Sequence, residues 1–101
     1  MPEPGQCVEV VRIRPKEGSE PRLLELRDEL VQSYRDASPA FVRASLLRLE
    51  DSDVWVDLWY WTDRAGAEAG LANPTPQFVE WGGLVDLLSL EWSEVIADHD
   101  C

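Results

Sequence analysis

The sequence predicts an α+β domain in which a four-stranded antiparallel sheet carries two helices on one face. Segments of strand composition and segments of helical periodicity alternate in the order β-α-β-β-α-β. Only Asp51-Ser52-Asp53 separates the two middle strands, and this polar turn predicts a hairpin. The length of 101 residues has room for one domain, which we expect over residues 1–101, with a core at about 7–98 and short disordered ends.

The first half of the chain contains one strand and one long helix. Residues 7–13 are rich in valine and predict a strand, and a turn follows it. Ser19 is the expected N-cap of a helix that runs to about Ala37, where Ser38-Pro39 ends it. The residues expected on the apolar stripe of this helix are Leu23, Leu26, Leu30 and Tyr34.

The rest of the chain is predicted to form a hairpin, a second helical region and a last strand. Residues 41–50 and 54–61 predict the hairpin strands, an alanine-rich helix begins at Thr62-Asp63, and residues 88–97 predict the last strand. Asn73-Pro74 breaks this helix, Thr75-Pro76 restarts a helical turn, and Gly82-Gly83 loosens or ends that second piece. The complete order is the ferredoxin-like βαββαβ plan, with both helical regions on one side of the sheet.

The third strand carries three of the five tryptophans, and alternation along a strand divides its side chains between two faces. We expect the first set, of valine, leucine and tyrosine, to pack beneath the helices. The second set would then form an aromatic wall that meets a partner subunit, a ligand or both, because the helices cover only one face. Two such sheets packed face to face would form a symmetric dimer. The two sets are Val54, Val56, Leu58 and Tyr60, and Trp55, Asp57, Trp59 and Trp61.

The charge of the chain argues against several classes of partner. The formal net charge is −11, which opposes binding to nucleic acid and to anionic membranes, although it leaves room for a cationic partner. No apolar run approaches the roughly 20 residues of a membrane span, and residues 1–5 lack the pattern of a signal peptide. We therefore expect a cytoplasmic protein with no nucleic-acid or membrane partner.

Few residues of this chain are candidates for binding a metal ion or for catalysis by histidine. The two cysteines, Cys7 and Cys101, lie near opposite ends of the chain and do not make a metal site alone. The single histidine, His99, lies in an acidic tail, where it is a poor member of a catalytic triad or a metal site. We expect no bound metal.

Two segments of the sequence resemble those of a known family. They are Leu58-Trp59-Tyr60-Trp61-Thr62-Asp63, before the alanine-rich helix, and Asn73-Pro74-Thr75-Pro76-Gln77-Phe78, at the helix break. With these segments the chain resembles the antibiotic biosynthesis monooxygenase-like proteins of the dimeric α+β barrel superfamily. The resemblance covers roughly residues 8–97. It implies the ferredoxin-like fold and a homodimer. The family includes cofactor-independent oxygenases of aromatic polyketides, quinone-related oxygenases and heme-degrading enzymes.

The branches of this family differ in the residues that they use. The heme-degrading branch uses an Asn on the first strand and a His on the second helix, whereas this first strand has no Asn and Trp81 lies near the position of that His. The polyketide-oxidising branch uses a Trp, an Asn, a Tyr and an Arg. Trp55 or Trp59 matches the Trp, but the single Asn, Asn73, lies at the helix break.

We interpret the protein as a cofactor-independent monooxygenase of an aromatic or quinone-like molecule, with Asp57 as the base. Cofactor-free oxygen chemistry needs a dry cavity in which the deprotonated substrate supplies the electrons. An Asp57–Arg43 pair, structural or ligand-binding, is the alternative role of these two side chains. The alternative function is a non-catalytic dimeric module, either binding an apolar small molecule or purely structural. The residues expected to bind substrate are Trp55, Trp59, Trp61, Phe78, Trp81 and Arg43.

Overall fold

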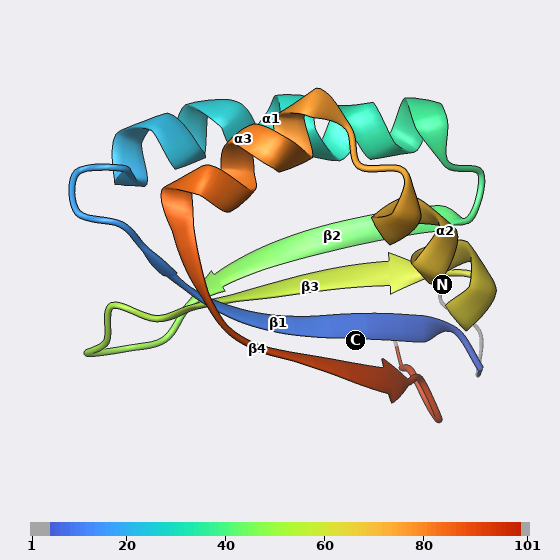
Figure 1. Cartoon of the computed structure of the whole chain (residues 1–101). Coiled ribbons are helices and arrows are strands. Elements are labelled where there is room, and N and C mark those ends of the chain that lie inside the picture. Colours follow the sequence, from blue (N-terminus) through green and yellow to red (C-terminus); the bar gives the residue numbers. More distant parts are fainter. Residues whose placement is uncertain (1–4, 100–101) are drawn as a thin grey trace.

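The computed structural model describes residues 5–99, in which three helices cover one face of a four-stranded sheet (Figure 1). The sheet order is β2-β3-β1-β4 with antiparallel neighbours, which confirms the predicted ferredoxin-like fold. The predicted break at Asn73-Pro74 divides the second helical region into α2 and α3. The elements are β1 (Cys7–Pro15), α1 (Glu20–Ala37), β2 (Phe41–Arg48), β3 (Trp55–Trp61), α2 (Arg64–Ala72), α3 (Pro76–Leu84) and β4 (Val85–Glu94).

Helix α1 packs its predicted apolar stripe against the sheet. Three leucines of the stripe are completely buried, and Tyr34 is buried beside them. Ser19 precedes the helix as predicted, but its side chain makes no cap hydrogen bond. Its hydroxyl instead shares its one hydrogen between the carbonyl oxygens of Lys16 (2.7 Å) and Leu84 (2.9 Å). Ser19 therefore ties the start of α1 to the end of α3.

The hairpin between β2 and β3 forms at the predicted turn. The Leu49 N–H donates to the Val54 carbonyl at 3.1 Å and closes the loop. Asp51 has a φ of 56°, in the left-handed region that Asp adopts more readily than most residues. The strands pair from Phe41 opposite Trp61 to Arg48 opposite Trp55.

The last strand begins three residues earlier than the sequence predicts. Gly82 and Gly83 continue α3, and β4 follows at Val85 without a loop. The reason is that Leu84 is held in place: its carbonyl accepts hydrogen bonds from the Lys16 N–H (2.9 Å) and from the Ser19 hydroxyl. A register shift against β1 lies between Arg12 and Ile13.

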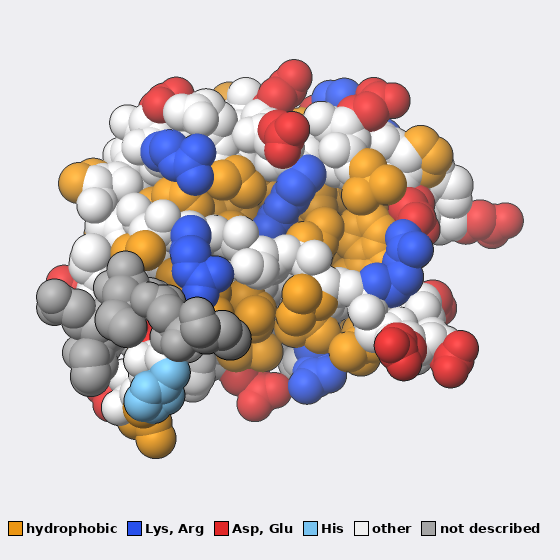
Figure 2. Space-filling view, turned by 180° about the vertical axis from the view of Figure 1, so that it is seen from behind, with side chains coloured by type: hydrophobic (Ala, Val, Ile, Leu, Met, Phe, Trp, Pro, Cys, Tyr) orange, Lys and Arg blue, Asp and Glu red, His pale blue; other side chains and the backbone are white. Residues whose placement is uncertain are grey.

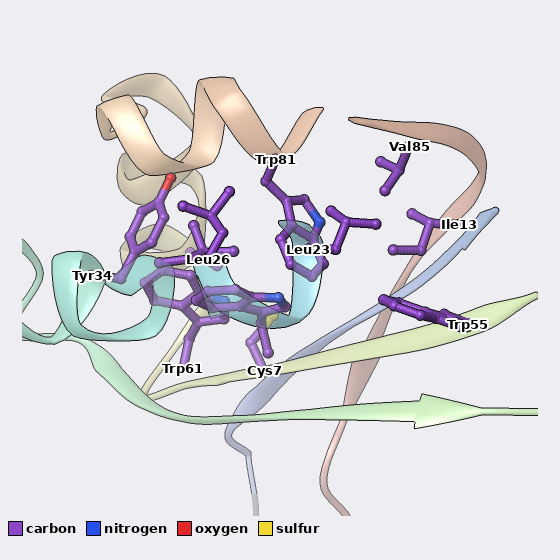
Figure 3. Packing of buried hydrophobic residues seen from close by; sticks show 12 residues of the cluster. Cys7, Ile13, Leu23, Leu26, Tyr34, Trp55, Trp61, Trp81 and Val85 are labelled. Atoms are coloured by element: carbon purple, nitrogen blue, oxygen red, sulfur yellow. The ribbon is translucent and has the colours of Figure 1, made fainter. Parts of the chain in front are cut away.

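The two faces of β3 are the reverse of the prediction. The tryptophans and Asp57 face the helices and are buried, and the Tyr34 ring of α1 lies 5.3 Å from the Trp59 ring. Figure 3 shows Trp61 among the buried side chains beside Tyr34. The valine and leucine set lies on the opposite, outer face. Both faces of β3 are apolar, so alternation identifies the two faces without deciding which one the helices cover. The buried acid is accommodated because α1 supplies an arginine to it.

The outer face of the sheet mixes apolar and basic side chains. Leu58 and Tyr60 are half-buried there, and the Arg43 guanidinium lies 3.8 Å from the centre of the Tyr60 ring. Seen from behind, the molecule shows hydrophobic side chains among basic ones, with acidic side chains toward the margins (Figure 2). None of the helices formed by residues 5–99 has the length and apolar character needed to cross a membrane.

Candidate functional site

A cavity of about 310 Å³ lies between the helix-facing side of the sheet and the helices. Its volume is at the small end of the range for ligand sites, and its walls are mainly aliphatic and aromatic. A cavity of this kind suits a compact aromatic molecule. The lining residues are Glu9, Val11, Ile13, Leu30, Tyr34, Asp57, Trp59, Trp61, Gly70, Leu71, Phe78, Trp81, Gly82, Val85, Leu87 and Leu90.

The structure brings five of the seven residues predicted for the site to this cavity. They are Asp57, Trp59, Trp61, Phe78 and Trp81. The other two, Trp55 and Arg43, lie outside the cavity. Trp55 is buried at the far end of β3, with the Arg48 guanidinium 5.7 Å from its ring centre. Arg43 lies on the outer face of the sheet, because the register of β2 shifts between Phe41 and Arg43 and places Arg43 opposite Tyr60.

Asp57 is bound by Arg27 of α1 instead of Arg43. Two hydrogen bonds join the guanidinium to the carboxylate, with Arg27 Nη1–Asp57 Oδ2 at 3.0 Å and Arg27 Nη2–Asp57 Oδ1 at 2.8 Å. The rings of Trp59 and Trp81 each have their centres 5.3 Å from the guanidinium carbon. This bidentate, aromatic-flanked geometry is typical of strong arginine–carboxylate pairs. Both oxygens of Asp57 are therefore engaged before any ligand enters.

Glu9 is a second carboxyl group in the cavity, and its side chain has no hydrogen bond or ion pair to any residue within 5–99. It is only 4% exposed. Burial away from water raises the pKa of Glu9 to about 7, and the charge of Asp57 adds to the shift. The Trp61 indole and the Arg64 guanidinium act in the opposite direction. A free carboxyl group with this pKa is suited to accept and return protons near neutral pH.

Two other polar groups face the same space. The Trp61 Nε1–H favours the charged form of Glu9, yet its geometry does not reach a hydrogen bond, and this buried donor has no partner among the described residues. The Tyr34 hydroxyl donates to the Gly70 carbonyl at 3.5 Å, and burial raises the pKa of Tyr34. Tyr34, expected only as core, thus also lines the cavity.

Sequence reasoning missed Glu9 and Arg27, although each leaves a detectable signal. Glu9 interrupts the apolar row of β1 between Cys7 and Val11, which face the helices with it. Arg27 follows Leu23 by four residues and precedes Leu30 by three, so it lies on the buried stripe of α1. A charged residue at such a position, with an opposite charge on the facing strand, predicts a buried pair.

The sequence matches the model of the family described as antibiotic biosynthesis monooxygenase over residues 7–77, most of the chain. The chain belongs to this family. Among solved structures it is similar to SnoaB, a cofactor-independent oxygenase from Streptomyces nogalater (TM-score 0.68, 23% identity, 95% of this chain and 96% of that chain). It is also similar to the heme-degrading protein Rv3592 from Mycobacterium tuberculosis (TM-score 0.71, 19% identity, 98% and 100%).

At these identities the two structures show a shared fold. A comparison with curated proteins gives no significant match. Membership of the family makes the protein monooxygenase-like. Within residues 5–99 no group of three or more His, Cys, Asp or Glu residues is arranged to hold a metal ion.

Proposed function

We propose that the protein is a cofactor-independent monooxygenase that oxidises a phenolic aromatic molecule in this cavity. The observation that carries the proposal is the unpaired Glu9 carboxyl group, with a pKa of about 7, inside an aromatic and aliphatic cavity. The base is Glu9 and not Asp57, because both oxygens of Asp57 already accept hydrogen bonds from Arg27. Asp57 then has a positioning role.

The reaction begins when Glu9 removes the phenolic proton. The resulting phenolate is rich in electrons and transfers one to O2, and the two radicals combine to form a carbon–oxygen bond. The peroxide that forms takes the proton from Glu9. Loss of the remaining hydrogen at that carbon, with cleavage of the O–O bond, gives a carbonyl group and water. One oxygen atom of O2 enters the product, the other leaves as water, and the substrate supplies all the electrons.

The cavity walls support this chemistry in two ways. Aromatic and aliphatic side chains exclude water, which would otherwise solvate the phenolate and the superoxide and compete for protons. Trp59 and Trp81 are held rigidly because Arg27 lies against both rings. A planar substrate therefore meets a fixed aromatic surface, and alignment of the reacting groups lowers the barrier.

Heme does not fit the residues present. Heme iron is held in proteins by His, Cys, Met or Tyr. Among the described residues that line the cavity, Tyr34 is the only one of these types, and its hydroxyl donates to Gly70. We therefore derive no step through heme.

Oxygen uptake with a panel of phenols and hydroquinones tests the proposal. We expect turnover by the natural protein, with kcat/KM rising with pH up to about 7 and then levelling, because the base acts in its ionised form. Glu9→Gln should lower kcat by about 10²- to 10⁴-fold, the usual contribution of a general base, and should abolish this pH dependence.

Glu29→Gln is the matched control, because Glu29 is an exposed acid on α1 outside the cavity. It should leave the rate unchanged. Equal loss in both variants would contradict the role of Glu9. Saturable binding with no oxygen uptake for any compound would instead identify a binding module without catalysis.

A further inference from the structure

Two tryptophans flank Glu9 in the sheet. Glu9 of β1 lies directly opposite Trp59 of β3 on one side and Trp92 of β4 on the other. Opposite residues in antiparallel strands point to the same face, so all three side chains lie on the side of the helices. Trp92 belongs to the edge strand, where it is half-buried and packs against the core. The Trp92 ring therefore lies between Glu9 and the solvent at this edge of the sheet.

Arg64, the first residue of α2, lies against the Trp92 ring. Its guanidinium carbon is 3.8 Å from the ring centre, closer than the 5.3 Å between Arg27 and the Trp59 ring. Arginine stacks on aromatic faces through its planar, charged guanidinium. The Arg64 Nε also forms an ion pair of 2.8 Å with Glu68 Oε1, one turn further along α2. The ring and the carboxylate together hold the Arg64 side chain in one orientation, over Trp92.

Little else in α2 covers this edge of the sheet. Alanine and glycine make up most of the helix, and its buried residues are Ala67 and Gly70. Glu9 is nevertheless only 4% exposed, although its strand is next to the edge strand. A carboxyl group in this position stays dry only if long side chains cover it. The Arg64 side chain and the Trp92 ring beneath it supply that cover on the side of β4.

Arg64 acts on the Glu9 carboxyl group in two opposite ways. Burial raises the pKa of Glu9 to about 7, so a side chain that keeps water out contributes to this rise. The positive charge of Arg64 lowers the pKa of Glu9, because it favours the carboxylate. Removal of the charge and removal of the cover should therefore change this pKa in opposite directions. The other titratable or charged groups that surrounding elements place near Glu9 are Cys7, Arg27, Tyr34, Asp57, Glu68 and Glu94.

We propose that Arg64 is a positioning residue, which holds the Trp92 ring against Glu9 and thereby keeps water away from the base of the reaction. The inference rests on the oxygenase function proposed above, in which Glu9 removes the substrate proton. It goes beyond that function because neither Arg64 nor Trp92 lines the cavity. Both act through Glu9, by maintaining the dry surroundings in which this carboxyl group accepts a proton near neutral pH.

NMR titration of isotopically labelled glutamate carboxyl groups tests this role without substrate, with the Glu9 signal assigned by its loss in Glu9→Gln. Arg64→Ala removes both cover and charge. The pKa of Glu9 should then fall from about 7 toward its ordinary value, because water reaches the carboxyl group. Arg64→Met removes the charge but keeps a long side chain that packs on an aromatic ring, so the pKa should rise. Trp92→Ala should lower the pKa without any change of charge.

Arg48→Ala is the matched control, because Arg48 also lies over a tryptophan, Trp55, at the far end of β3. It should leave the pKa of Glu9 unchanged. The inference is overturned if this pKa does not fall in Arg64→Ala, or if it falls equally in Arg48→Ala. An ordinary pKa of Glu9 in the natural protein would remove both proposals. The expected pKa changes without oxygen uptake by the natural protein would remove the oxygenase proposal alone. Oxygen uptake that depends on Glu9, with a raised pKa in Arg64→Ala, would remove only this inference.

Discussion

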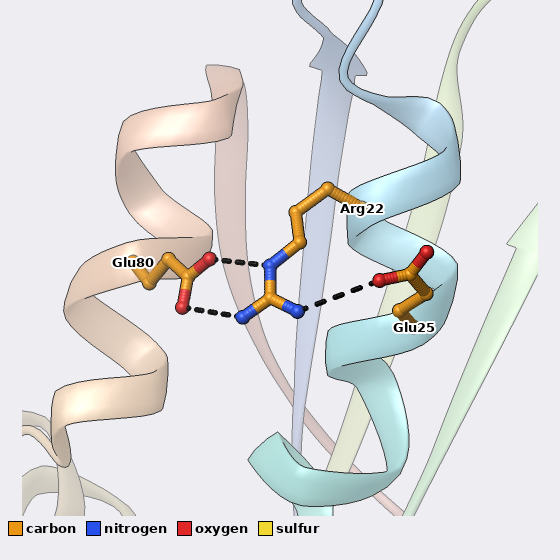
Figure 4. A network of polar contacts seen from close by, with 3 residues as sticks. All are labelled: Arg22, Glu25 and Glu80. Carbon is orange, nitrogen blue, oxygen red and sulfur yellow. Dashed lines mark hydrogen bonds and ion pairs between the residues drawn. The ribbon is translucent and has the colours of Figure 1, made fainter.

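Arg27 keeps a positive charge in the interior because other groups replace the water that it loses. Its side chain is 12% exposed and that of Asp57 is 6% exposed. Two hydrogen bonds and two indole rings surround the guanidinium. By contrast, Arg22 makes comparable contacts in solvent, with hydrogen bonds of 2.6 and 2.9 Å to Glu80 and an ion pair of 3.6 Å to Glu25 (Figure 4).

Burial predicts that the two arginines contribute differently to stability. Arg27→Met should lower the free energy of unfolding by about 3–5 kcal/mol, because it leaves the Asp57 carboxylate buried without a counter-ion. The double variant Arg27→Met/Asp57→Leu should recover most of this loss, since no buried charge remains. Urea denaturation followed by tryptophan fluorescence measures both values.

Arg22→Met is the control for the general loss of an arginine from α1. It should have a much smaller effect, because solvent and salt screen an exposed pair. If Arg22→Met and Arg27→Met are equally destabilising, burial is not the reason for the effect. If the double variant is no more stable than Arg27→Met, the cost does not come from the unpaired carboxylate.

At the scale of elements, glycines let α2 pack directly against Ala40, just before β2, and against the Trp61 ring of β3. A Cβ atom at Gly66 would lie 2.3 Å from the Ala40 Cβ, and one at Gly70 would lie 2.7 Å from the Trp61 ring. Helix α2 has only nine residues, too short to be stable alone, so it depends on this packing and on its caps. Asp63 supplies the N-cap by accepting from the Gly66 N–H at 2.7 Å.

Gly66→Ala should therefore destabilise the protein, although alanine favours helices. The added methyl group must move α2 away from Ala40, and overpacking of this kind costs about 1–3 kcal/mol, against a gain in helix propensity of about 1 kcal/mol. Gly83→Ala in α3 is the control, because its Cβ would meet nothing within 4 Å, and it should be neutral or stabilising. Thermal unfolding of the two variants would contradict this account if their shifts had the same sign.

The sequence was sufficient for the order of the elements because their signals are local. The hairpin turn at Asp51-Ser52-Asp53, the start of α2 at Thr62-Asp63 and the break at Asn73-Pro74 are each determined by neighbouring residues, and the structure has all three. The start of β4 was misplaced, because the end of α3 is held by contacts to Lys16 and Ser19, far away in the chain.

The composition of the site was predicted less well, because it depends on which face the helices cover. Alternation placed Trp59 and Trp61 on one face correctly, but the expectation that the helices cover the other face put them on the wrong side of the sheet. From the sequence alone, either Arg43 of β2 or Arg27 of α1 is a candidate partner of Asp57. The packing of α1 on the sheet decides that Arg27 binds it. Glu9 can be recognised as a candidate site residue once β1 and β3 are known to be neighbouring strands.

At the scale of the molecule, none of the three helices formed by residues 5–99 covers the outer face of the sheet. Leu58 and Tyr60 are half-buried there, and Leu47 is 47% exposed. Extended apolar surface of this kind favours association. We propose that two copies pack through their outer faces, which differs from the sequence-based expectation that the tryptophan face forms the dimer contact.

Light scattering coupled to size exclusion tests this proposal. The natural protein should have twice the mass of the 11.5 kDa chain. Leu58→Glu should give monomers, because it places a charge on the outer face near the middle of the sheet. Leu24→Glu, on an exposed position of α1, should leave the mass unchanged. A natural protein of single-chain mass, or dissociation by both variants, would contradict the proposed interface.

The stacking of Trp59 on Trp61 has an optical consequence. Their ring centres are 6.4 Å apart with 21° between the planes, and both rings line the cavity. Indoles at this separation couple their electronic transitions, which gives a paired positive and negative band in circular dichroism. A molecule that enters beside them and turns either ring changes the shape of that band. The protein therefore carries an intrinsic, label-free reporter of whether its interior is occupied.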